Sequence, residues 1–274
     1  MIKFGTSGWR GVIGEDFTFE NVRVATQGVT NYLKKSGQKG SGVIVAYDTR
    51  FLSEKFASEA ARILAFNGIH AYLCNRDVPT PCVSYETVRR KAMGAINFTA
   101  SHNPPEYNGL KFSTSNGAPA LPEITQQIEG EIHAVQSTKE RLDVYEKSEL
   151  IETIDPKDRY LAELRNKVDV DVIRKSGLRI AIDSLYGTSR DYLDYFLRSP
   201  ASRSRSFTTI ATRTSAAFPP NAARKTSASC ARSSPTRSST SAWPRTATPI
   251  ASASSTTATA SCRRTSSWPS SRST

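Results

Sequence analysis

The stretch Ala95–Pro105 reads Ala-Ile-Asn-Phe-Thr-Ala-Ser-His-Asn-Pro-Pro, and the rest of the chain is interpreted around it. Its first four residues form a short, mostly apolar run that is typical of a buried strand. A loop of small and polar residues follows the C-terminal end of that strand, which is where open α/β sheets place their chemistry. Pro104 and Pro105 fix their own φ angles, and Pro104 also pushes Asn103 toward extended backbone. The pattern predicts a stiff loop that presents one side chain at a fixed angle.

The polar side chains in and behind this loop admit two interpretations. Ser101 is a hydroxyl that could carry a phosphoryl group. His102 and Lys111 could supply donors and positive charge, and Asn103 a neutral amide. Alternatively, the loop is a polar turn whose Ser and Asn side chains bond their own backbone, and the lysine is a solvated residue after an Asn-Gly turn. The residues by themselves leave both interpretations open.

The basic charge of the chain is concentrated in its last part. The 274 residues can hold one large or two ordinary domains, and the formal net charge is +12. Residues 1–198 hold all 25 acidic and 26 of the 37 basic residues, so residues 199–274 carry 11 basic residues and no acid. Residues 1–198 show no basic stripe interleaved with aromatic side chains. The composition therefore gives little support to nucleic-acid binding.

The sequence also gives little indication of a membrane protein or of a metal site built from Cys or His. No apolar run approaches the roughly 18 residues of a transmembrane helix, and the N-terminus lacks the apolar core of a signal peptide. We expect a soluble, cytoplasmic protein that does not bind membranes. Cys74 and Cys82 have a spacing that fits no zinc signature, and both are expected to be ordinary core or loop residues. Three histidines are too few and too scattered for a His-based metal site.

A second motif opens the chain, where Gly5–Gly11 reads Gly-Thr-Ser-Gly-Trp-Arg-Gly. Its glycines allow close backbone approach and positive φ, which suits a loop wrapped around an anion. Because Gly-rich turns are common, this motif is weak evidence when it is taken alone.

Together, the two motifs resemble the α-D-phosphohexomutases, the phosphoglucomutase/phosphomannomutase family. The active-site loop of that family reads Thr-Ala/Gly-Ser-His-Asn-Pro, and its N-terminal signature reads Gly-Thr-Ser/Asp-Gly-x-Arg-Gly. Both patterns occur here in the same order. The resemblance implies that Ser101 is a phosphoserine, that Lys111 acts in proton transfer, and that Arg10 lies near the phosphoserine.

The resemblance also implies a reaction and its cofactors. The family interconverts hexose 1-phosphates and 6-phosphates: the phosphoserine donates its phosphoryl group, and a hexose 1,6-bisphosphate intermediate reorients and returns the other phosphate. Mg²⁺ is implied as a cofactor that bridges the phosphoserine to a carboxylate loop, so Ser101 as phosphoserine is an implied metal ligand. The implied partner is a phosphorylated hexose. The implied catalytic residues are Ser101, Lys111, His102 and Arg10, and the implied substrate- or phosphate-binding residues are Thr6, Ser7, Gly8 and Asn103.

Apolar periodicity predicts alternating strands and helices over residues 1–198. Gly42–Tyr47 is a continuous apolar run typical of a strand buried on both faces of a parallel sheet. Phe19–Lys35 has a helical period, and Ser53 is expected to cap a helix that ends near Phe66. Further strands are expected over residues 69–73, 94–98 and 178–182, and further helices over residues 82–90, 121–135, 160–168 and 189–197.

The alternation predicts an α/β fold, with a three-layer α/β/α mixed-sheet domain over residues 1–145. Residues 155–198 are expected to begin an incomplete second domain of the same type, and residues 199–274 to form a non-globular tail. Asp48-Thr49-Arg50 follows a predicted central strand. Arg50 could face phosphate, or an Asp–Arg pair could brace the loop.

Residues 199–274 are rich in Ser, Thr, Ala, Arg and Pro without an apolar period, which is typical of a disordered basic segment. A shifted reading frame of the coding DNA offers a second explanation for this composition. With plausible codons for Trp243–Thr256, the offset frame reads Ala-Thr-Asp-Gly-Asp-Ala-Asp-Arg-Phe-Gly-Ile-Val-Asp, which contains the family's Asp-Gly-Asp-x-Asp-Arg metal loop. The same offset over Pro200–Ile210 reads Gly-Ile-Glu-Val-Glu-Val-Ile-His-Asp-Tyr, an alternating strand. We hypothesise a frameshift near residues 198–200.

As translated, the chain lacks the carboxylates of the metal loop, so we expect it to have little or no mutase activity. Two other classes are considered: a non-catalytic fragment that binds phosphosugar weakly, and a protein whose basic tail binds nucleic acid or anionic surfaces. The resemblance of the N-terminal signature favours a phosphoglucomutase or phosphomannomutase, and so implies a glucose or mannose phosphate as substrate.

Overall fold

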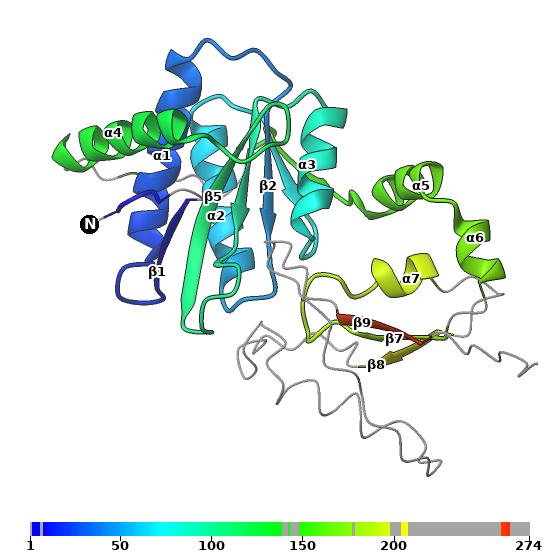
Figure 1. Ribbon diagram of the computed structural model, residues 1–274. Coiled ribbons are helices and arrows are strands. Elements are labelled where there is room, and N and C mark those ends of the chain that lie inside the picture. The colour runs from blue at the N-terminus through cyan, green and yellow to red at the C-terminus, as the bar shows by residue number, and fades with distance from the viewer. Residues whose placement is uncertain are drawn as a thin grey trace, which may run out of the picture.

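A six-stranded mixed sheet forms the centre of the computed structural model, which describes residues 2–5, 8–138, 142, 148–176, 179–197, 204–207 and 259–263 (Figure 1). The strand order is β1-β5-β4-β2-β3-β6. The four strands β4, β2, β3 and β6 run parallel to one another, whereas β5 is antiparallel to both β4 and β1. The strands are β1 Trp9–Val12, β2 Val43–Tyr47, β3 Ala71–Cys74, β4 Gly94–Phe98, β5 Tyr107–Thr114 and β6 Ile151–Ile154.

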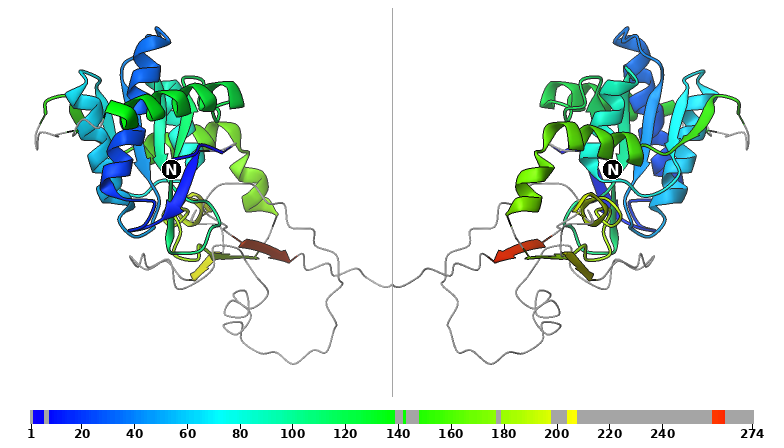
Figure 2. Two further views of the ribbon diagram at one scale, coloured as in Figure 1. Left: turned by 90° about the vertical axis from the view of Figure 1, so that its left-hand side faces the viewer. Right: turned by 90° about the vertical axis from the view of Figure 1, so that its right-hand side faces the viewer.

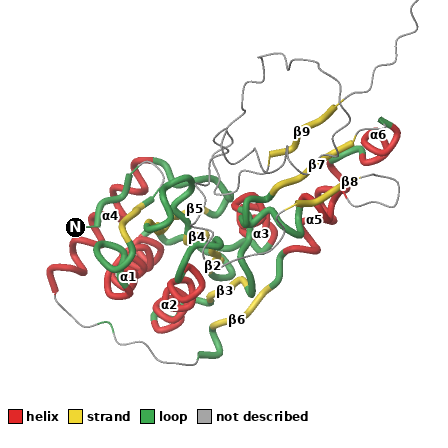
Figure 3. The backbone as a smooth tube through the Cα atoms, turned by 90° about the horizontal axis from the view of Figure 1, so that it is seen from below, coloured by secondary structure: helices red, strands yellow, loops and turns green. Residues whose placement is uncertain are grey.

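Helices cover both faces of this sheet and make the fold a three-layer α/β/α arrangement, as expected. Seen from below, α1 and α2 lie on one side of the strands and α3 and α5 on the other (Figure 3). The helices are α1 Phe19–Lys35, α2 Ser53–Phe66, α3 Thr80–Arg89, α4 Pro122–Thr138, α5 Lys157–Lys167, α6 Val170–Lys175 and α7 Leu193–Leu197.

The central strands are almost wholly apolar because their two faces enter two different cores. Val43 and Val45 of β2 belong to a cluster with side chains of α1, α2 and α4. Ile44 and Ala46 belong to a second cluster with side chains of α3, α5 and α7. All five residues of β2 and of β4 are buried, which is the pattern of a parallel sheet covered on both sides.

Helix α1 follows the predicted bounds because its ends carry clear signals. Thr18 caps the N-terminus by accepting a hydrogen bond from the backbone N–H of Asn21 at 3.2 Å. Its apolar side packs on α2 and α4. Gly28 lies where α1 meets α4: a Cβ there would lie 3.0 Å from the backbone nitrogen of Ile132 and would overlap its side chain.

This close approach predicts opposite effects for two helical glycines. Gly28→Ala should destabilise the fold by about 1–3 kcal/mol, because the added methyl forces α1 and α4 apart. Gly130→Ala should stabilise it by up to about 1 kcal/mol, because alanine has the higher helix propensity and no atom lies within 4 Å of the new Cβ. Urea unfolding of both variants tests this, and a Gly28→Ala protein as stable as Gly130→Ala would contradict it.

The start of α2 departs from the expectation that Ser53 caps it. Ser53 is the first residue of the helix, and Leu52 precedes it in the left-handed region with φ 61°. The Ser53 hydroxyl instead donates to Oδ1 of Asp48 at 2.9 Å. The prediction was wrong because the Ser53 oxygen accepts a hydrogen bond from Asn108 Nδ2 at 2.9 Å instead of from a backbone N–H of the helix.

Three strands of the large sheet were not predicted from periodicity. β5 and β1 contain glycine and polar residues that weaken the strand pattern. β6 has two consecutive exposed residues, Glu152 and Thr153, and lies at the edge of the sheet. Pairing with neighbours that are distant in the chain, rather than local composition, creates these strands.

A second, smaller sheet follows the first domain (Figure 2). β7 Arg179–Asp183 pairs in parallel with β8 Ser204–Phe207 and antiparallel with β9 Thr259–Arg263. β8 and β9 are the parts of residues 199–274 that the structure describes; the rest of that expected tail lies outside the described residues. Among the helices described, none has the length and hydrophobicity needed to cross a lipid bilayer.

Candidate active site at the serine loop

The serine loop, residues 99–106, joins β4 to β5, and Ser101 lies at its turn. Ser101 has φ 58° and a relative exposure of 5%. Positive φ is uncommon for a residue with a side chain and marks a locally strained backbone. The Ser101 N–H donates to Oγ1 of Thr99 at 3.1 Å, and the N–H of Asn103 donates to the carbonyl of Ala100 at 3.1 Å. The loop is thus a tight, hydrogen-bonded turn.

The Ser101 and Asn103 side chains contact other side chains rather than the loop's own backbone. Ser101 Oγ lies 3.4 Å from Nδ1 of the exposed His102. Asn103 Oδ1 accepts a hydrogen bond from Nη1 of Arg10 at 2.6 Å. These contacts argue against a plain turn whose Ser and Asn side chains bond only their own backbone.

Strand register brings the predicted cations to one face of the sheet. Arg10 of β1 pairs with Gly109 of β5, and Lys111 of β5 pairs with Asn97 of β4. Since side chains alternate along strands and paired residues share a face, the Arg10, Lys111 and Asn97 side chains all project from the same face. Trp9 and Leu110, between them in the register, pack in the opposite core.

Gly109 permits the close packing on which this arrangement depends. A Cβ at Gly109 would lie 2.6 Å from the carbonyl oxygen of Thr99 and 2.8 Å from that of Trp9. Any larger residue would therefore push β5 away from the serine loop and from β1. The Asn-Gly pair that was considered as a possible turn is part of a continuous strand.

Lys111 is a half-buried lysine in the middle of a strand, not a solvated residue after a turn. Burial lowers its pKa, the nearby Arg10 charge lowers it further, and Asp48 opposes the shift. An amine with a lowered pKa is deprotonated over a wider pH range and can accept a proton from a hydroxyl. This lysine therefore suits proton transfer, and its strand follows the serine loop directly.

The N-terminal motif approaches the same strand. Gly5 and Gly8 exchange backbone hydrogen bonds of 3.0 and 3.4 Å, and Gly8 has φ 112°. A Cβ at Gly8 would lie 2.9 Å from Cα of Lys111, so only glycine allows this approach. Thr6 and Ser7, also expected to bind phosphate, lie outside the described residues.

The described residues do not fit a magnesium ion. Among them, no group of three or more His, Cys, Asp or Glu side chains could hold a metal. Asp48 is the carboxylate whose charge reaches Lys111. Its Oδ1 already accepts from the Ser53 hydroxyl and from the Arg50 backbone N–H, each at 2.9 Å, and its Oδ2 lies 3.4 Å from Arg50 Nε. These oxygens are engaged by protein donors, so within the described part of the chain the Ser101 hydroxyl has no carboxylate partners for a metal.

Asn108 of β5 and Asn97 of β4 form side-chain hydrogen bonds near the serine loop. The sequence motifs did not identify either residue. Asn108 Nδ2 donates to Ser53 Oγ at 2.9 Å, and its Oδ1 accepts from the N–H of Gly109 at 2.8 Å. Asn97 Nδ2 donates to Thr80 Oγ1 at 3.2 Å. Polar residues inside otherwise apolar strands were the only sequence signal that could have identified them.

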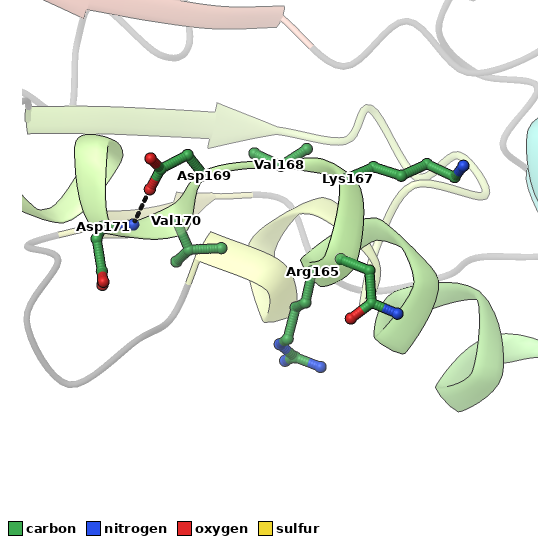
Figure 4. A pocket seen from close by; sticks show the side chains of 7 residues that line it. Arg165, Lys167, Val168, Asp169, Val170 and Asp171 are labelled. Carbon is green, nitrogen blue, oxygen red and sulfur yellow. Dashed lines mark hydrogen bonds between the residues drawn. The ribbon is translucent and has the colours of Figure 1, made fainter.

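An open hollow of about 510 Å³ lies elsewhere, at the turn between α5 and α6 (Figure 4). Its lining runs from Arg165 to Asp171, and the backbone N–H of Asp171 donates to Oδ1 of Asp169 at 3.0 Å. No residue of the serine loop lines it, and its charged side chains point in different directions. It has no connection with the chemistry at Ser101.

Comparison with known proteins supports the assignment of the fold. Residues 1–139 match the family model of phosphoglucomutase/phosphomannomutase, alpha/beta/alpha domain I. A phosphoglucomutase of Komagataeibacter xylinus is 31% identical over 206 residues, which cover 70% of this chain and 37% of that protein. A phosphoglucosamine mutase of Gloeothece citriformis is 31% identical over 196 residues, which cover 68% of this chain and 38% of that protein.

A solved structure agrees with these sequence relatives. The crystal structure of a protein from Thermus thermophilus, described as a phosphomannomutase, superposes with a TM-score of 0.71 at 30% identity, covering 84% of this chain and 51% of that one. The chain thus spans about two fifths of the curated relatives and half of the solved one. With its domain I match, its α/β/α layers and its serine loop between β4 and β5, the chain belongs to the phosphoglucomutase/phosphomannomutase family.

Proposed function

We propose that this chain carries the phosphoserine-bearing part of a phosphohexomutase, an enzyme that interconverts hexose 1-phosphates and 6-phosphates. The observation that carries the proposal is the placement of Ser101 at a strained turn next to a sheet face that presents Arg10 and Lys111. The names of the relatives, which include phosphoglucomutase and phosphoglucosamine mutase, support a phosphorylated hexose as substrate. They do not select one hexose.

The chemistry assigned to these residues is a phosphoryl exchange. The bond between Ser101 Oγ and phosphorus breaks and its electron pair stays on Oγ, while a sugar hydroxyl oxygen forms a new bond to the same phosphorus. The hydroxyl proton passes to the neutral Nζ of Lys111, which then delivers a proton to the leaving Ser101 Oγ. Arg10 orients the loop through Asn103 and adds positive charge near the transferred group. His102, beside Ser101 Oγ, donates toward the phosphoryl oxygens. The second half of the cycle returns the other phosphate of a hexose 1,6-bisphosphate to Ser101.

The translated chain is proposed to be catalytically incomplete. On this proposal, the carboxylate loop that would bind Mg²⁺ is encoded in the offset reading frame of the DNA. It is therefore missing from residues 199–274 as translated. Sequencing the coding DNA across codons 190–260 tests this directly: the offset frame should give an Asp-Gly-Asp-x-Asp-Arg peptide. A coding sequence whose alternative frames lack that peptide would sink the frameshift hypothesis.

Turnover measurements test the proposed function itself. The 274-residue chain should show no measurable conversion of glucose, mannose or glucosamine 1-phosphate, whereas the chain with its frame restored should convert at least one of them. Ser101→Ala in the restored chain should lower the rate by roughly 10⁴-fold or more, as removal of other covalent nucleophiles does. Turnover by the 274-residue chain, or an active Ser101→Ala variant, would contradict the proposal.

A further inference from the structure

The Arg50 guanidinium is buried behind the serine loop and contacts three of its backbone carbonyls and that of Tyr107, the first residue of β5. Nη1 donates to the carbonyl of Pro104 at 2.7 Å and to that of Tyr107 at 2.9 Å. Nη2 donates to the carbonyl of Asn103 at 2.6 Å and to that of Ser101 at 3.2 Å. The four acceptors extend from the nucleophile itself to the first residue of β5, so one side chain spans the whole turn.

These contacts use the full donor capacity of the side chain. A guanidinium has five N–H groups in a fixed plane: the four on Nη1 and Nη2 point to carbonyls, and Nε lies 3.4 Å from Oδ2 of Asp48. The Arg50 and Asp48 side chains have exposures of only 8% and 5%. Arg50 therefore has no donor left for a phosphate group, which decides between the two roles considered for it.

Asp48 is linked by hydrogen bonds to β5, the strand that follows the loop. The Ser53 hydroxyl donates to Asp48 Oδ1, and Asn108 of β5 donates to the same Ser53 oxygen, each at 2.9 Å. The hydrogen bonds thus run from β5 through Ser53 and Asp48 to Arg50 and back to the serine loop. Both ends of the loop are tied to one buried cation.

We propose that Arg50 is a positioning residue, whose guanidinium holds the serine loop in the turn that keeps Ser101 at positive φ. This inference rests on the proposed function of Ser101. Positive φ is disfavoured for serine, so the surrounding contacts must impose it. A lysine at position 50 would keep the charge but not the planar fork, and its three donors cannot reach four carbonyls.

NMR of the isotope-labelled 274-residue chain tests the proposal. A residue with positive φ has a short distance between its amide and α protons, and so gives a strong intraresidue cross-peak between them. Ser101 should show this cross-peak in the unsubstituted chain and lose it in Arg50→Lys. Amide exchange at Asn103 and Tyr107 should accelerate by about tenfold or more, the change expected on losing even one hydrogen bond to a charged group.

Arg62→Lys is the matched control, because Arg62 lies on α2 with its side chain 37% exposed and pairs at 3.3 Å with Glu59, away from the serine loop. It should leave the Ser101 cross-peak and the loop exchange rates as they are. A general loss of stability would accelerate exchange throughout the core but would not change φ at Ser101. If Arg50→Lys keeps the Ser101 cross-peak and the slow exchange of the loop, the proposal is overturned.

A measurement without substitution covers the case in which Arg50→Lys does not fold. In the unsubstituted chain, the four Nη protons of Arg50 should give separate resonances that exchange slowly with water, since each is engaged and the side chain cannot rotate. One averaged, fast-exchanging resonance would overturn the proposal. Failure of the proposed function would appear differently, as turnover that survives Ser101→Ala, so the two outcomes are distinguishable.

Discussion

Lys111→Met is expected to lower turnover of the frame-restored chain by about 10²–10⁴-fold, the usual contribution of a general acid or base. The substitution keeps the length of the side chain and removes the amine that would accept the sugar hydroxyl proton. Steady-state rates with the preferred hexose 1-phosphate measure the effect. An unchanged rate would show that the proton goes elsewhere, and the matched surface variant Lys167→Met, whose lysine pairs with Glu163 on α5, should have no effect.

The pH dependence of the same lysine follows from its surroundings. Burial and the Arg10 charge lower the pKa of Lys111, so the deprotonated form appears at lower pH than for a free lysine. Arg10→Met should raise this pKa and shift the acid limb of the rate to higher pH, whereas Arg10→Lys keeps the charge and should leave the limb in place. Carbon NMR titration of Lys111 in the 274-residue chain measures the shift without turnover.

The sign of the effect on stability is also determined. Because the pKa of Lys111 is lower in the folded state, the unfolded chain binds more protons between the two pKa values. The free energy of unfolding therefore gains a contribution that increases as pH rises through this window. Lys111→Met removes that contribution, so its unfolding free energy should depend less on pH in the same range.

Asp77→Ala is expected to destabilise the protein by about 3–5 kcal/mol, because it leaves a buried guanidinium without its partner. Asp77 Oδ1 lies 2.6 Å from Nη2 of Arg190, and both side chains are largely buried. The pair connects the loop between β3 and α3 to the segment that precedes α7. Urea unfolding measures the loss, and exchange of the amides over residues 179–197 shows whether that segment detaches.

A neighbouring ion pair provides the matched comparison. Arg76 and Asp191, each adjacent to a member of the buried pair, lie 3.1 Å apart, and the Asp191 side chain is 50% exposed. Asp191→Ala should cost only about 0–1 kcal/mol, as is usual for exposed pairs. The double variant Asp77→Ala, Arg190→Ala should lose less than the two single losses added together. Equal losses at Asp77 and Asp191 would contradict the importance of burial.

The sequence by itself determined the central strands, the bounds of α1 and the identity of the serine loop. Val43–Tyr47 and Gly94–Phe98 are apolar apart from Asn97, and such a run has few alternatives to a covered parallel strand. Helix α1 carries its cap and its period within its own residues. These features depend on neighbouring residues in the chain, so they can be recognised without knowing which distant segments pack against them.

Only the tertiary structure decided how the site is assembled. β1 and β5 acquire their strand geometry from each other, and this pairing places Arg10 against Asn103 although 93 residues separate them. The Arg50 donors reach carbonyls more than 50 positions away, and backbone acceptors leave no trace in the sequence. The residue types of the site were therefore predictable from motifs, whereas their contacts depend on long-range pairing, which no local period encodes.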